Sequence, residues 1–135
     1  MNNLLDANAI LRYLLNDIEE QAETVEQAIK NGAYTIPEVM AEVVYVLSGV
    51  YECERKEISD TIRVLLDEID ISDKPVILSA LDLFGSTNLD YVDCILVARA
   101  VVLNENVLTF DKKLTKQILK KKDKPSKGTS SANSL

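Results

Sequence analysis

The chain has 135 residues, of which 47% are hydrophobic and 27% are charged, and its formal net charge is −7. These values predict a single globular domain and argue against wholesale disorder. Histidine is absent, so Ser-His-Asp catalysis, Cys-His catalysis and histidine-containing zinc sites are excluded. No apolar run reaches roughly eighteen residues and the N-terminus does not resemble a secretory signal, so we expect a cytoplasmic protein that spans no membrane.

Short apolar segments alternate with longer stretches that carry apolar residues at helical spacing. We expect β-strands at residues 3–6, 34–36, around Ile71, and 107–110. We expect helices over residues 7–15, 19–30, 37–48, 55–69, 75–84, 90–103 and 112–121. Gly85 is expected to end the fifth of these helices. This alternation predicts an α/β sandwich with a mostly parallel central sheet.

Composition changes towards the C-terminus, where lysines are followed by Ser, Gly, Thr and Asn with almost nothing apolar. We therefore predict one domain over residues 1–121 and a disordered tail over 122–135. Residues 1–111 carry a net charge of −14, whereas residues 112–135 carry +7. Because residues 1–111 are so acidic, they are expected to repel nucleic acid unless metal ions or a protein partner invert the local charge.

Most acidic residues lie at positions expected on a solvent-exposed helix face. Four acidic residues do not. Asp6 and Asp111 each end a predicted strand, where ligands bind in open α/β sheets. Glu42 lies in the most apolar predicted helix, and Asp93 lies one turn into another. Each of the four also has a simpler interpretation. Asp6 and Asp111 could be helix caps, and Asp93 could interact with the helix dipole while Asp90 caps the helix. Glu42 could lie with Glu38 on a solvent-exposed face.

One arrangement accounts for all four acids together, namely a cluster of carboxylates at the C-terminal edge of the sheet. Clustered carboxylates repel one another, and their pKa values rise unless a cation lies between them. Oxygen-only ligands select hard cations, so Mg²⁺ or Mn²⁺ is the expected occupant.

Four segments resemble the motifs of PIN domains in order and spacing. They are Leu4–Asn8 with Leu11–Leu15 after it, Ile36–Glu42, Leu89–Ala98 and Leu108–Leu114. The resemblance covers residues 3 to about 119, and the nearest branch is the VapC-type toxins of toxin–antitoxin pairs. It implies a three-layer α/β/α fold and a metal-dependent endoribonuclease.

The resemblance also assigns roles residue by residue. The family's acidic quartet of metal-binding, catalytic residues falls on Asp6, Glu42, Asp93 and Asp111, and auxiliary positions fall on Asp90, Asn8 and Thr109. Ala7 departs from the pattern, because the family more often has Thr or Ser there.

The expected reaction is hydrolysis of an RNA phosphodiester by a water that a metal activates. Lys112, Lys113 and Lys116 are candidates to hold the RNA backbone, although a solvated helix end explains them equally well. Family members form homodimers and bind an antitoxin, and an acidic body suits a basic antitoxin segment.

Two alternatives remain at this stage. A binding module that kept the fold and lost the chemistry would bind metal without cleaving RNA. A Mg²⁺-dependent phosphatase with Asp6 as nucleophile would usually carry a second Asp two positions on, where this chain has Asn8.

Overall fold

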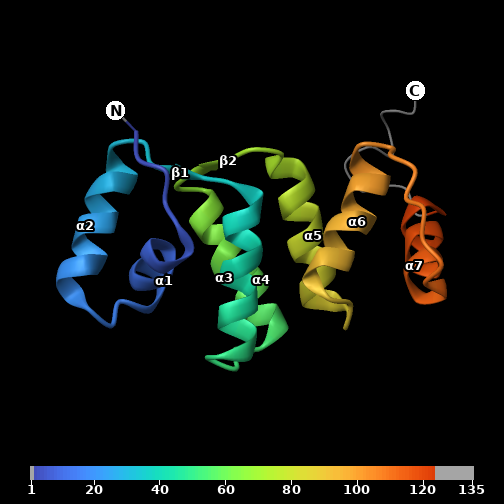
Figure 1. The fold of residues 1–135 in the computed structure, drawn as a ribbon, viewed down its shortest axis with the longest axis horizontal. Coiled ribbons are helices and arrows are strands. Elements are labelled where there is room, and N and C mark those ends of the chain that lie inside the picture. Colours follow the sequence, from blue (N-terminus) through green and yellow to red (C-terminus); the bar gives the residue numbers. More distant parts are fainter. Residues whose placement is uncertain (1, 124–135) are drawn as a thin grey trace.

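The computed structural model describes residues 2–123, which form seven helices around a very short parallel sheet (Figure 1). The elements are, in chain order, α1 (Ala7–Leu15), α2 (Glu19–Lys30), β1 (Tyr34–Thr35), α3 (Pro37–Gly49), α4 (Arg55–Leu66), β2 (Asp70–Ile71), α5 (Lys74–Ser86), α6 (Tyr91–Val102) and α7 (Lys112–Asp123). All seven predicted helices are therefore present.

The sheet places three segments side by side in parallel. Tyr34 pairs with Asp70 and Thr35 with Ile71, and Leu4 forms an isolated parallel bridge to Tyr34. The Leu5 N–H donates to the Tyr34 carbonyl at 2.8 Å. The predicted α/β class with a short parallel sheet is thus confirmed, although the expected strand at residues 3–6 is reduced to this single bridge.

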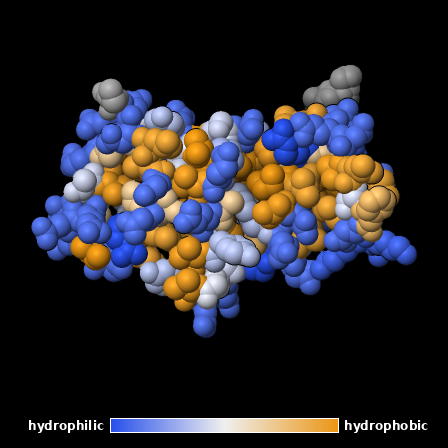
Figure 2. Space-filling view, viewed as in Figure 1, coloured by the Kyte–Doolittle hydropathy of each residue, from blue (hydrophilic) through white to orange (hydrophobic). Residues whose placement is uncertain are grey.

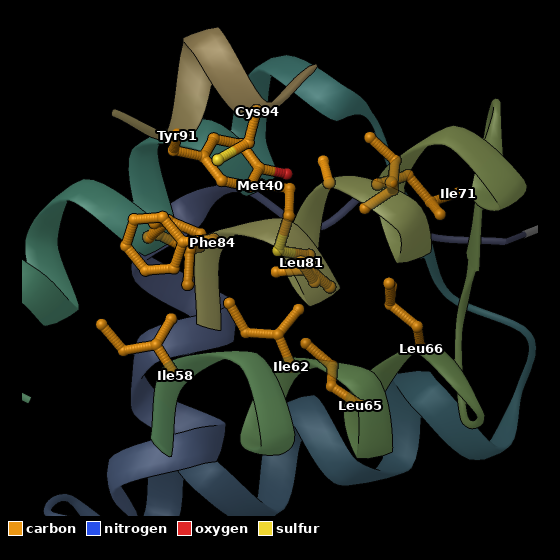
Figure 3. Close-up of a cluster of buried hydrophobic side chains, with 14 of the residues drawn as sticks. Met40, Ile58, Ile62, Leu65, Leu66, Ile71, Leu81, Phe84, Tyr91 and Cys94 are labelled. Carbon is orange, nitrogen blue, oxygen red and sulfur yellow. The ribbon is translucent and has the colours of Figure 1, made fainter. Parts of the chain in front are cut away.

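The core lies mainly between helices, and most of it comes from α3, α4, α5 and α6. Met40 of α3 is fully buried and lies near Leu81 of α5 and Tyr91 of α6 (Figure 3). Ile58 and Ile62 are buried on the α4 side of the same cluster. The apolar face of each helix accounts for this packing, because residues three and four apart share one side.

Two predicted helix boundaries are wrong. Helix α4 ends at Leu66 rather than at residue 69. The Lys74 ammonium donates to the carbonyls of Leu66 and Ile69 at 2.7 and 3.2 Å and so satisfies carbonyls at and beyond the end of the helix. Gly85 lies inside α5, one residue before its end, so it is not the terminating residue that we predicted.

The buried strand predicted at residues 107–110 is also wrong. This segment forms no strand, and its Leu108 and Phe110 side chains are 91% and 94% exposed. Before it, Asn104 adopts a left-handed conformation with φ of 56°, and Arg99 holds Glu105 through two hydrogen bonds of 2.7 and 2.8 Å. These contacts direct the chain along α6 instead of towards the sheet.

Hydrophobic surface consequently gathers at the end of the molecule where α6 and α7 lie (Figure 2). Helix α7 packs mainly against α6 and buries one side chain, Leu114. It also includes Lys122 and Asp123, the first two residues of the predicted tail. Residues 124–135, the rest of that prediction, lie outside the described residues.

No helix within residues 2–123 is both long enough and apolar enough to cross a membrane.

Arg55 joins α4 to the connection between α5 and α6. Its guanidinium donates to the carbonyl of Phe84 at 2.9 Å and to that of Leu89, and it lies 3.8 Å from the centre of the Phe84 ring. Hydrogen bonds from a charged donor stabilise more than neutral ones do. Arg55 therefore fixes the segment that leads into Asp90 and helix α6.

We predict that Arg55→Met lowers the free energy of unfolding by about 3 kcal/mol, because two partly buried carbonyls lose a charged donor. Chemical denaturation measures this change. The neighbouring Lys56→Met is the matched control, since Lys56 makes only an exposed 3.3 Å ion pair with Asp60. Equal stability of the two variants would contradict the role given to Arg55.

Candidate functional site

Asp6 is the N-cap of α1. Its side chain accepts a 2.8 Å hydrogen bond from the Ala9 backbone N–H, and the residue itself is exposed. The capping role that the sequence allowed is therefore confirmed. It uses one carboxylate oxygen, Oδ1, and the second oxygen has no hydrogen bond among the described residues.

Thr35 is a supporting residue that the sequence analysis missed. It is only 1% exposed, and its hydroxyl donates to the Leu5 carbonyl at 2.9 Å, directly before Asp6. The hydroxyl holds the end of the first segment against β1. The sequence could not reveal this hydrogen bond, because threonine is common in β-strands whether or not its hydroxyl binds a neighbouring carbonyl.

Glu42 lies on an exposed face of α3, together with Glu38. The simpler reading of Glu42 as a solvent-facing acid on an otherwise apolar helix is thus correct. Glu42 also faces a neighbour: with Asp90 it lines a hollow of about 390 Å³ between α3 and the start of α6. The structure therefore brings together one residue of the predicted quartet and one auxiliary acid.

Asp93 is the most perturbed of the predicted acids. Partial burial in the first turn of α6 raises its pKa, and the neighbouring carboxylates of Asp90 and Asp111 raise it further. Lys113 acts in the opposite direction. Asp90 and Asp111, the residues before α6 and α7, are therefore close enough to Asp93 to disfavour its charged form.

Asp90 occupies the N-cap position of α6, but its side chain makes no capping hydrogen bond. Asp111 does cap α7, because its Oδ1 accepts from the backbone N–H groups of Lys113 and Leu114 at 2.9 and 3.2 Å. The simpler reading of Asp90 as a side-chain cap is therefore wrong within residues 2–123, whereas that reading of Asp111 is confirmed.

The remaining auxiliary residues differ in their surroundings. Thr109 accepts a 3.0 Å hydrogen bond from the Asp111 N–H and so shapes the turn that presents this acid. Asn8 is exposed on α1. Lys112, Lys113 and Lys116 are exposed in the first turns of α7, where the helix dipole does not favour positive charge.

The structure therefore forms two overlapping sets of acids. Glu42 shares a hollow with Asp90, and Asp90 and Asp111 act on Asp93, whereas Asp6 is not among the charges that shift Asp93. Within residues 2–123, no group of three or more acidic or cysteine side chains is arranged to hold a metal ion. The donors nevertheless have the chemistry of a hard-cation site, since all are carboxylates and two of them, Asp90 and Asp111, raise the pKa of Asp93.

A larger hollow lies elsewhere. It measures about 650 Å³, and residues of α1, α2 and α4 line it, with an apolar floor that includes the buried Ala22 and Leu65. Four glutamates surround that floor: Glu19, Glu23, Glu26 and Glu68. The Tyr13 hydroxyl donates to Glu68 at 2.8 Å, which raises the pKa of Tyr13 to about 12. None of the predicted site residues lines this acidic groove.

The comparisons with known proteins decide the family. A family model described as the PIN domain matches residues 4–118. The chain belongs to the PIN domain family. It is also 29% identical over 122 residues to a VapC ribonuclease of Aquifex aeolicus (strain VF5), a match that covers 84% of this chain and 90% of that protein. No solved structure matched the chain significantly.

We predict that Asp90→Asn lowers the pKa of Asp93 in the metal-free protein, because it removes one of the two carboxylates that repel it. Carboxyl-carbon NMR across a pH titration measures the shift. Asp73→Asn is the matched control, since Asp73 is an N-cap residue that does not act on Asp93. An unchanged Asp93 pKa in Asp90→Asn would mean that the two acids do not interact.

Proposed function

We propose that this PIN domain is a Mg²⁺- or Mn²⁺-dependent endoribonuclease, and that it is the toxin of a toxin–antitoxin pair. The observation that carries the proposal is the match of residues 4–118 to the PIN domain family, and the raised pKa of Asp93 near Asp90 and Asp111 is consistent with it. The likeness to a VapC ribonuclease supports RNA as the substrate.

In this proposal Asp6, Glu42 and Asp93 hold a first metal ion, directly or through water, and Asp111 completes a second metal site or orients a water molecule. When bound, the metal polarises a phosphoryl oxygen and lowers the pKa of a water molecule that attacks the phosphodiester. Asp90 supports the site from the cap position of α6. Thr35 and Thr109 position Asp6 and Asp111 through the hydrogen bonds described above.

The acidic charge of the chain is compatible with an RNA substrate under two conditions. A divalent cation offsets the repulsion between carboxylates and phosphate. Lys113 already lies close enough to act on Asp93, and Lys112 and Lys116 are exposed on the same helix. We propose that these lysines bind the RNA backbone beside the acids.

The antitoxin and a homodimer are further parts of the proposal. The acidic groove over α1, α2 and α4 combines an apolar floor with four carboxylates, which suits a basic amphipathic segment of the antitoxin. Glu23→Lys is expected to weaken antitoxin binding and to reduce its dependence on salt, as titrations at two ionic strengths would show.

Cleavage of a structured RNA by the wild type and by Asp93→Asn, with Mg²⁺, Mn²⁺ or EDTA, tests the nuclease. We expect cleavage by the wild type with either metal and none with EDTA. The variant should lose at least about 100-fold in rate, since even the partners of metal ligands cost 10–100-fold when replaced. Asp67→Asn, which removes an exposed acid at the end of α4, is the matched control and should cleave normally.

The outcomes separate the alternatives. Equal cleavage by wild type and Asp93→Asn would contradict the assigned site. Metal binding without cleavage of any RNA would favour the silent binding module. Release of phosphate from small phosphate esters, lost in Asp6→Asn, would favour the phosphatase.

A further inference from the structure

The hollow beside Glu42 and Asp90 is also lined by apolar and aromatic residues that have no role in the proposed hydrolysis. Its other walls are Ala41 and Tyr45 of α3 and Tyr91 and Val92 of α6. Tyr45 is 81% exposed and Val92 is 62% exposed. The hollow is therefore an apolar, aromatic surface that continues directly from two of the acids assigned to the site.

The geometry of α3 links Tyr45 to the acids. Glu42 and Tyr45 are three residues apart on one helix, so their side chains lie on the same face. Across the hollow, the wall formed by Tyr91 is rigid, because this ring is 5% exposed and packs edge-on against Phe84 at 5.9 Å. Tyr45 thus presents a free aromatic face opposite a fixed wall.

Charge decides what chemistry the hollow accepts. It is lined by two carboxylates and by no lysine or arginine, so a phosphate group is repelled there. A carboxylate accepts hydrogen bonds, and nucleobases carry amino and imino N–H donors along their edges. Aromatic side chains are also the usual stacking partners of unpaired bases in single-stranded RNA.

We propose that this hollow binds one unpaired nucleobase of the RNA substrate, stacked on Tyr45 with its edge towards Glu42 and Asp90. The inference rests on the proposed nuclease function and names the part of the substrate that lies next to the acids. It implies that the enzyme selects single-stranded or looped RNA, since a paired and stacked base cannot enter.

The chain contains no tryptophan, so Tyr45→Trp introduces a single fluorophore at the proposed platform. The probe is a short single-stranded RNA in Ca²⁺, with its integrity checked on a gel and its binding followed independently by anisotropy of an end label. We expect stacking to quench the new tryptophan. Tyr51→Trp, at an exposed tyrosine that does not line the hollow, is the matched control and should not respond.

Affinity gives a second measurement. Tyr45→Ala should weaken RNA binding roughly 5- to 140-fold, the equivalent of about 1–3 kcal/mol for one stacked base. Tyr45→Phe should stay within about twofold of wild type, because it keeps the aromatic face. An oligonucleotide with abasic sites should bind without quenching Tyr45→Trp.

Failure of this inference is distinguishable from failure of the proposed function. If RNA binds by anisotropy but the tryptophan at position 45 does not respond, or if Tyr45→Ala keeps full affinity, the base platform is wrong and the nuclease stands. If Tyr45→Ala instead converts a dimer into a monomer with unchanged RNA affinity, the hollow is a contact between copies and the inference is overturned. If the wild type neither binds nor cleaves RNA, both proposals fail.

Discussion

The guanidinium of Arg55 fixes the segment that leads into Asp90 and Asp93 of this PIN domain. It binds the Phe84 and Leu89 carbonyls and lies over the Phe84 ring, so it joins α4 to the end of α5 and to the residue before Asp90. The start of α6 is held in place by that contact. Asp90 and Asp93 then repel one another because the backbone, rather than an attraction between side chains, sets their separation. Such repulsion is an energetic cost that a divalent cation would relieve.

The same end of the molecule combines the two features that an RNA-cleaving site needs. Carboxylates supply ligands for a hard cation, and Lys113 and its neighbours supply positive charge for the phosphate backbone. The hollow beside Tyr45 adds an apolar surface that, in our proposal, binds a base. Metal and RNA backbone would thus be bound by different side chains, and Glu42 would lie at both the metal site and the base-binding hollow.

Local patterns predicted the helices well and the long-range contacts less well. The spacing of apolar residues over 7–15 and over 19–30 places them on one face of a helix. Both helices have the predicted bounds. The segment 107–110 has an equally apolar pattern, but a strand requires a neighbour that the pattern does not specify. The Arg99–Glu105 pair and the left-handed Asn104 direct it away from the sheet. Asp93 and Asp111 were predicted as neighbours and do interact, whereas Asp6 is not among the charges that act on Asp93. Thr35 and Arg55 act through backbone carbonyls, which no sequence pattern reveals.

The central claim is that the acids predicted from the sequence bind divalent metal at a common site. A crystal structure with Mn²⁺, located by its anomalous scattering, tests this claim most directly. The account predicts a Mn²⁺ ion bound by Asp93 together with oxygens of Asp6, Glu42 or Asp111. We expect metal–oxygen distances of about 2.0–2.2 Å, as is typical of small hard cations. A Mn²⁺ ion bound elsewhere, or no ion near Asp93 at saturating metal, would contradict it.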